Sequence, residues 1–346
     1  MSLHGRMPTT GTYDEALDRF HRTGPEFEGW LSNHGPMVVE ILARAGRGEV
    51  VHGWTDRYRA RLDDPPAERW PIDPASWSQA LGEATRTGDW IALFARELQE
   101  GAWTQVLARW WPRLLPGIAA GATHGVIRVG HVVQALREAE TAPRVAELAH
   151  GLGYWAARWQ AMPLARPSGG QSAADLLGAI PRVPRQESGV RERLAQLTDT
   201  PGWAAHAALL AEPRSVAEVP GALDELVDAA VVGYSRWAHG NPTMLVHAAT
   251  APNAVAMALP SLPRSQWRDS FNAVWSASAA LFAAYRPAAP RPVTPTSASA
   301  AGILGRAVDH GGEHVIKFTD TALRSYRRTA DPAALTAAVT AVQLGA

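Results

Sequence analysis

Four histidines lie in otherwise apolar stretches of this 346-residue chain, and the last of them is followed three residues later by a lysine in an equally apolar setting. They are His34, His124, His247 and His314, with Lys317. A buried imidazole must satisfy two ring nitrogens and a buried ammonium is costlier still, so these residues need a shared explanation. A bound cation provides one. The chain has no cysteine, so imidazole or oxygen ligands would have to hold a transition metal, and iron, zinc, manganese and copper all remain possible.

His314 and Lys317 lie three residues apart and therefore on one face of a helix. A lysine in such a place most often lays its stem along the surface and keeps its ammonium in water. The alternative is a buried neutral amine that reacts with carbon dioxide to form a carbamate, which is an anionic oxygen ligand. Desolvation would lower the lysine pKa as this reaction requires. The carbamate would supply a negative charge that neutral imidazoles cannot give to a divalent ion.

Residues 310–314, HGGEH, match the inverted zinc-peptidase pattern H-x-x-E-H. That motif needs an unbroken helix through both histidines, and its two central glycines each cost about 1 kcal/mol there relative to alanine. Asp309 and the glycines are more typical of the approach to a helix start, which would leave His310 away from the ligand face. The peptidase interpretation is therefore disfavoured.

His124, Arg128 and His131 are spaced i, i+4 and i+7, so one helix face carries all three. We expect His124 to be a metal ligand. Arg128 and His131 are the candidate catalytic residues, Arg128 as a charge partner or anion-binding group and His131 as a support for the ligands. For His131, a hydrogen-bonded core histidine is the more common role.

Apolar residues recur at three- and four-residue spacing almost throughout, which predicts a nearly all-α protein with one large multi-helix domain over 1–346 and a core of about 12–330. The Pro/Gly/Ser-rich segments 163–172 and 286–300 predict long surface loops. The predicted helices are 12–22, 36–46, 52–62, 87–99, 102–112, 122–138, 143–162, 187–197, 216–238, 242–249, 264–285, 312–329 and 332–343.

Acidic and basic residues balance at 33 each without a concentrated basic patch, which argues against a nucleic-acid partner. No apolar stretch is long enough for a membrane span or a signal peptide, so we expect a cytoplasmic protein without a membrane partner. The motifs G-x-G-x-x-G, G-x-x-x-x-G-K-[ST] and G-x-S-x-G do not occur, which disfavours a nucleotide-binding fold and an α/β-hydrolase.

Segments spread over about residues 12–330 resemble the questin oxidase-like family. This family includes fungal enzymes that oxidatively open anthraquinone-type rings in polyketide pathways, and bacterial members of similar length. Its members were first described as Baeyer–Villiger-type oxidases, and one branch resembles mononuclear non-haem iron dioxygenases whose metal is held by four histidines and a carboxylated lysine. The segments are NHGPMVVE (33–40), WWPRLLPG (110–117), AGATHGVIRVGH (120–131), GYWAARW (153–159), PTMLVHAATAP (242–252) and EHVIKFTDTALRSY (313–326).

Transferred residue by residue, the family's ligand pattern falls on the same four histidines, with Lys317 as the modified ligand. The chain has Met37 and Arg128 where fungal members tend to carry further histidines. The departures concern the substrate more than the metal site.

The resemblance implies an Fe(2+)-dependent oxygenase that uses dioxygen to cleave a ring of a polycyclic aromatic polyketide, such as an anthrahydroquinone. Two alternatives stay open. One is a Baeyer–Villiger-type monooxygenase that needs NADPH, with a separate reductase as a further partner, and the other is a non-catalytic helical binding protein for aromatic metabolites. Four aromatic residues are candidates for stacking on the substrate, although a tryptophan-rich core is the more common role for such residues. They are Trp110, Trp111, Tyr154 and Trp155.

Overall fold

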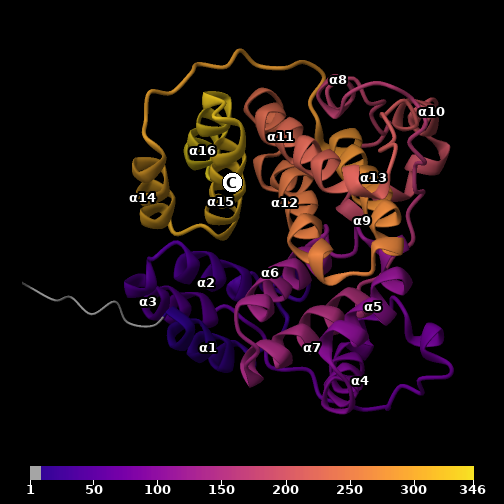
Figure 1. The fold of residues 1–346 in the computed structure, drawn as a ribbon, viewed down its shortest axis with the longest axis vertical. Helices are drawn as coiled ribbons and strands as arrows, with labels where there is room; N and C mark the ends of the chain where they lie inside the picture. Colours follow the sequence, from indigo (N-terminus) through magenta and orange to yellow (C-terminus); the bar gives the residue numbers. More distant parts are fainter. Residues whose placement is uncertain (1–8) are drawn as a thin grey trace, which may run out of the picture.

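The computed structural model describes residues 9–346, and these residues form an all-α fold of 16 helices with one two-stranded hairpin (Figure 1). This confirms the predicted fold class. The hairpin was not predicted. It pairs β1 (Glu26–Phe27) with β2 (Leu31–Ser32) through a turn in which Glu28 and Gly29 have positive φ.

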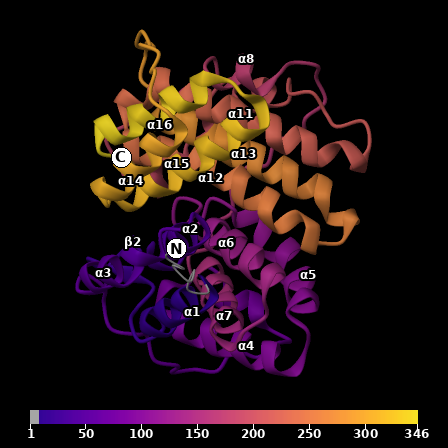
Figure 2. The same ribbon diagram turned by 60° about the vertical axis from the view of Figure 1, so that its left-hand side comes forward.

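The helices fall into two groups that Figure 2 shows one above the other. A continuous hydrophobic core extends through both groups, and a smaller apolar cluster joins the first three helices. The first group comprises α1 (Thr9–Phe20), α2 (Gly35–Arg44), α3 (Gly48–Arg59), α4 (Thr87–Glu100), α5 (Trp103–Leu114), α6 (His124–Glu138) and α7 (Ala142–Ala157). The second comprises α8 (Ala173–Leu177), α9 (Val190–Ala195), α10 (Trp203–Ala207), α11 (Val219–Trp237), α12 (Pro242–Ala258), α13 (Trp267–Tyr285), α14 (Ala300–His310), α15 (Glu313–Thr329) and α16 (Pro332–Leu344).

Two helix pairs make the most extensive contacts between the groups, because α6 packs on α12 and α2 packs on α15. The first pair approaches closely at Gly130, where an added Cβ would lie 2.4 Å from the carbonyl oxygen of Ala254. Glycine at this position therefore lets the backbones of α6 and α12 come together. All four histidines of the predicted set lie on, or next to, these four helices.

Helix α12 continues to Ala258, although the sequence predicts its end at 249, ahead of Pro252. A proline inside a helix removes the hydrogen bond to the carbonyl four residues earlier. Here the Ser278 hydroxyl of α13 donates to that carbonyl, Ala248 O, at 2.9 Å. Pro112 in α5 likewise removes the hydrogen bond to Ala108 O, and Gln266 Nε2 donates to that carbonyl instead, at 2.7 Å. Hydrogen bonds from another element thus replace the bonds that both prolines remove.

Three helices were not predicted. Two of them, α8 and α10, have only five residues each, and the pattern of α14 is weakened by Gly302 and Gly305. Helix α7 ends at Ala157 rather than at 162, and in the segment that follows Met162 N donates to Pro116 O. Residues 163–172 and 286–299 are loops, apart from isolated bridges at Gly169 and Gln171. Among the described residues, no helix is both long and apolar enough to cross a membrane.

Candidate metal centre

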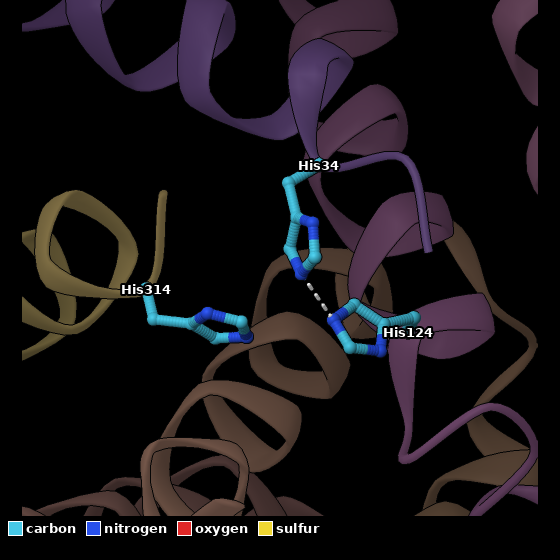
Figure 3. A group of neighbouring side chains, drawn as sticks. All are labelled: His34, His124 and His314. Carbon is cyan, nitrogen blue, oxygen red and sulfur yellow. Dashed lines mark hydrogen bonds between the residues drawn. The ribbon is translucent and has the colours of Figure 1, made fainter. Parts of the chain in front are cut away.

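Three of the predicted ligands meet where the two helix groups face each other. One ring nitrogen from each of His34, His124 and His314 lies within 4.8 Å of the others, and the rings point toward one another (Figure 3). The closest approach joins His34 Nε2 and His124 Nε2 at 2.7 Å. These residues come from α2, α6 and α15, which are distant in sequence.

His247 and Lys317 complete the group. His247 Nε2 lies 3.2 Å from His314 Nε2, and the His247 ring centroid is 4.4 Å from that of His124. The Lys317 ammonium is close enough to lower the pKa of all four imidazoles. The structure therefore brings all five predicted residues together, and we call them the His–Lys cluster.

Helix starts place three of the histidines. His34 precedes the first residue of α2, His124 begins α6, and His314 is the second residue of α15. The positive end of each helix dipole is therefore near the cluster, where it disfavours cationic side chains and favours anionic ligands. His247 lies further into α12, which starts at Pro242 behind an Asn241 cap.

The outer ring nitrogens have partners that help to fix which nitrogen faces inward. His124 Nδ1 lies 2.5 Å from Gly121 O, and because a carbonyl only accepts, Nδ1 carries the proton and Nε2 keeps its lone pair. His34 Nδ1 lies 3.0 Å from the Tyr58 hydroxyl, which also accepts from His34 N. His247 Nδ1 lies 3.4 Å from Thr123 Oγ1. Such outer partners are usual for histidines that bind a metal.

The inner nitrogens of His34, His124 and His314 lie close enough together to be candidate ligands of one ion, with His247 beside His314. Imidazole nitrogens bind transition metals at about 2.1 Å, so two adjacent ligands on one ion lie about 3 Å apart. The separations of 2.7 Å and 3.2 Å between Nε2 atoms match that value. Each contact is a hydrogen bond when one of the two ring nitrogens carries a proton, and when neither does, a cation between the two lone pairs removes their repulsion. The four imidazoles suit iron, zinc, copper or nickel.

Lys317 is the exception within the cluster, because its Nζ is buried and has no hydrogen-bond partner among the described residues. Burial lowers its pKa to about 7, against a smaller opposing effect from Glu313. Burial and the neighbouring positive charges also lower the pKa of each histidine well below its usual value. Lys317 is moreover the only lysine of the chain. The cluster thus contains four imidazoles that disfavour positive charge and one amine without a partner among the described residues.

Arg128 and His131, the predicted catalytic residues, are each paired with a buried carboxylate. Arg128 forms a two-point ion pair with Glu147, in which Nη2 lies 2.8 Å from Oε2. Burial alone would raise the pKa of Glu147, but Arg128 lowers it to about 2. His131 Nδ1 lies 2.8 Å from Glu40 Oε2. These contacts give both residues a role in holding helices together, and among the described residues neither forms a hydrogen bond or ion pair with a member of the His–Lys cluster.

The four predicted substrate-binding aromatics are all buried in the core. Trp110 donates to Glu97, Trp111 to Ser270, and the Trp155 indole to Gly117 O at 3.1 Å. The Tyr154 hydroxyl lies 2.6 Å from Ser32 Oγ. The structure therefore places their polar atoms against protein partners, which matches the core role that the sequence left open.

The H-x-x-E-H match is broken by the fold. Helix α14 ends at His310, Gly311 has a φ of +74°, and α15 begins at Glu313. His310 Nδ1 accepts from Gly312 N and stands away from the cluster. No unbroken helix joins the two histidines, so the peptidase interpretation is wrong.

Sequence reasoning missed two residues that border the cluster. Tyr58 contacts His34 as described above, and Glu313 Oε1 lies 3.9 Å from His34 Nδ1. Glu313 was considered only within the peptidase pattern. Tyr58 follows Trp54 by one helical turn and their rings stack at 4.7 Å, but nothing in that spacing indicates contact with residue 34.

No protein-family model matches this chain, and no curated protein is similar to it in sequence. The resemblance to the questin oxidase-like family therefore stays a prediction that rests on the segments quoted for it.

Proposed function

We propose that this protein is a non-haem iron-dependent oxygenase that cleaves a ring of a polycyclic aromatic polyketide, such as an anthrahydroquinone, with dioxygen. One observation carries the proposal: the imidazoles of His34, His124 and His314 converge, with His247 beside His314, and the buried amine of Lys317 in the same cluster has no partner among the described residues. The choice of iron and of the substrate class follows the family resemblance. A bound iron ion would supply electron transfer to dioxygen, which a spin-paired organic molecule performs slowly on its own.

Lys317 would complete the ligand set as a carbamate. Its neutral amine attacks carbon dioxide, a nitrogen–carbon bond forms, and one proton is released. A pKa of about 7 leaves a large fraction of the amine neutral near physiological pH. The resulting anion would be favoured by the nearby helix starts and would offset part of the metal's charge.

The other residues of the chain would orient the ligands and keep water out. Gly121 O and the Tyr58 hydroxyl hold the outer nitrogens of His124 and His34, so that the inner nitrogens face one point. Burial of four of the five cluster residues excludes bulk water, which strengthens electrostatic interactions there.

Metal analysis of the purified protein tests the site. We expect about one transition-metal ion per chain, and the iron-loaded protein should be active. The His247→Ala variant should lose the bound metal. The matched control is His52→Ala, because His52 is about half exposed and lies outside the cluster. Wild-type protein without tightly bound metal, together with unchanged behaviour of His247→Ala, would contradict the proposal.

Carbamate formation has its own signature because the chain has one lysine. With ¹³C-labelled bicarbonate, NMR should show a carbamate signal that disappears in Lys317→Met, while the signal from the α-amino group persists in both proteins. A spectrum identical for the two proteins would contradict carbamate formation.

The reaction type can be read from labelled dioxygen and an anthrahydroquinone. A ring-opened product that contains both labelled oxygen atoms without added NADPH supports the dioxygenase. One labelled atom with a requirement for NADPH would favour the Baeyer–Villiger-type alternative, and tight binding without oxygen uptake would favour the binding protein.

A further inference from the structure

A surface pocket of about 450 Å³ lies between α3 and the turn that joins α14 to α15. Two of its lining residues also contact the His–Lys cluster. The Tyr58 hydroxyl lies 3.0 Å from His34 Nδ1, and Glu313 Oε1 lies 3.9 Å from the same atom. One wall of this pocket is therefore the outer boundary of the cluster.

His314 differs from the other members of the cluster in its exposure. It is partly exposed, whereas His34, His124, His247 and Lys317 are all buried. It directly follows Glu313, which lines the pocket. The partly exposed member of the cluster is thus next in sequence to a residue that lines the pocket.

Two arginines face this pocket. Arg57 is exposed and has no ion pair with any described residue. The Arg61 guanidinium lies 4.4 Å above the Phe27 ring and 5.3 Å from the Tyr58 ring, and its one carboxylate contact is Glu313 at 3.7 Å. Planar guanidinium groups bind carboxylate and phenolate oxygens through paired hydrogen bonds and pack on aromatic faces.

A larger cavity of about 700 Å³ lies among α8, α11 and α13. We disfavour it as the substrate site because it does not adjoin the His–Lys cluster. None of its lining residues belongs to the His–Lys cluster or bonds to one of its members. Its charged lining has four carboxylates, Asp175, Glu225, Asp228 and Asp331, against the single arginine Arg236, whereas the pocket beside α3 has two arginines and two carboxylates and repels an anionic molecule less.

We propose that the pocket beside α3 is the entrance through which an anionic aromatic substrate reaches the His–Lys cluster, with Arg57 and Arg61 binding its carboxylate or phenolate oxygens. This inference rests on the proposed function, since it assigns the substrate side of that site. Glu313 separates the pocket from His34, so the Arg61–Glu313 contact must open when the substrate's oxygen replaces the carboxylate on Arg61.

Binding of two probes to the metal-loaded protein tests the proposal without turnover. The probes are anthraquinone-2-carboxylate and its neutral analogue 2-(hydroxymethyl)anthraquinone. We expect the double variant Arg57→Ala/Arg61→Ala to weaken binding of the carboxylate about 10- to 100-fold, the range for loss of hydrogen bonds to a charged group, and to change binding of the neutral probe less than threefold. The control is Arg137→Ala, since Arg137 is exposed and lies elsewhere, on α6.

A second measurement checks the link to the cluster. In Co²⁺-loaded protein, the carboxylate probe should shift the visible absorption of the ion, and the double variant should lose that shift at the same probe concentration.

Unchanged affinity of the double variant for the carboxylate probe, or an equal loss of affinity for both probes, would overturn the assignment of the arginines. Tight binding without a spectral shift would overturn the pocket as the entrance. If the wild-type protein takes up no oxygen yet shows the selective loss, the oxygenase proposal fails while the anion site stands.

Discussion

Helices α2, α6 and α15 carry two buried polar clusters of opposite character. At their starts, with His247 of α12, lies the His–Lys cluster, in which every group can take up a proton and the nearest carboxylate, Glu313, is 3.9 Å from His34 Nδ1. Further along the same helices lies a charge network in which acidic and basic groups alternate. Its members are Glu40, Arg44, His131, Gln134, Asp320 and Arg324.

The charge network is almost fully paired. Arg44 contacts both Glu40 and Asp320 at 2.8 Å, and Arg324 Nε donates to Asp320 at 2.9 Å. Burial raises the pKa of Asp320, but the two arginines outweigh it and lower the value to about 2. In the His–Lys cluster, by contrast, neighbouring charges add to the effect of burial. A balanced buried network can fix helix register by itself, whereas the unbalanced cluster needs an external partner.

The contrast between the His–Lys cluster and the charge network predicts two separate pH ranges in which the free energy of unfolding decreases. This pH dependence is the largest effect that we expect. The folded pKa values of the four histidines are lowered, so below about pH 6.5 the unfolded chain binds more protons and the metal-free protein loses stability as the pH falls. Each imidazole contributes up to about 1.4 kcal/mol per pH unit. Asp320 and Glu40 also have lowered pKa values, so their contribution is present above about pH 4 and is lost only below it.

Urea unfolding of chelator-treated protein between pH 8 and pH 3 measures both ranges. The free energy of unfolding should fall steeply from pH 6.5 to pH 5, and His247→Leu should reduce that slope by roughly one proton's contribution. A free energy of unfolding that stays constant between pH 7 and pH 5 would be incompatible with four buried neutral imidazoles.

Removing one carboxylate from the charge network should have the next largest effect. In Asp320→Asn, Arg324 loses its carboxylate partner and Arg44 keeps only Glu40, so we expect a loss of about 3–5 kcal/mol in the free energy of unfolding. Glu212→Gln is the control, because the Glu212–Arg268 pair is largely exposed and its loss should change stability by less than about 1 kcal/mol. Equal effects of the two substitutions in urea unfolding would show that the network does not stabilise the helices.

The His–Lys cluster could be predicted because its members contrast with their own neighbours in sequence. Each histidine stands among apolar residues, and residues 314 and 317 share a helix face whatever the tertiary structure. The charge network gives no such signal. Glu40 and Arg44 look like an ordinary exposed i, i+4 pair until α6 and α15 pack beside them.

Contacts between distant helices explain the other errors as well. The sequence predicts an end for α12 ahead of Pro252, because the hydroxyl that replaces the lost hydrogen bond comes from Ser278 on another helix. The sequence leaves a pocket role open for Trp110 and Trp111, although the core is the more common role, and their hydrogen bonds to Glu97 and Ser270 in the folded protein favour the core. Periodicity predicts where helices lie, and not which polar atoms meet between them.

Lys317→Met gives the smallest effect and the most direct comparison of the two clusters. Methionine fills a similar volume without a polar atom, so the metal-free protein should gain about 1–3 kcal/mol in the free energy of unfolding at pH 7, because a buried amine without a partner is removed. The gain should shrink as the pH rises from 7 to 10.5, since the lowered pKa of Lys317 makes the unfolded chain bind more protons in that range and the wild-type protein gains stability. The same variant should bind the metal more weakly than the wild type. If Lys317 merely lay along the surface, the substitution would change neither the free energy of unfolding nor the metal affinity. A loss of stability in the metal-free variant would mean that the Lys317 amine already has a partner in the wild-type protein.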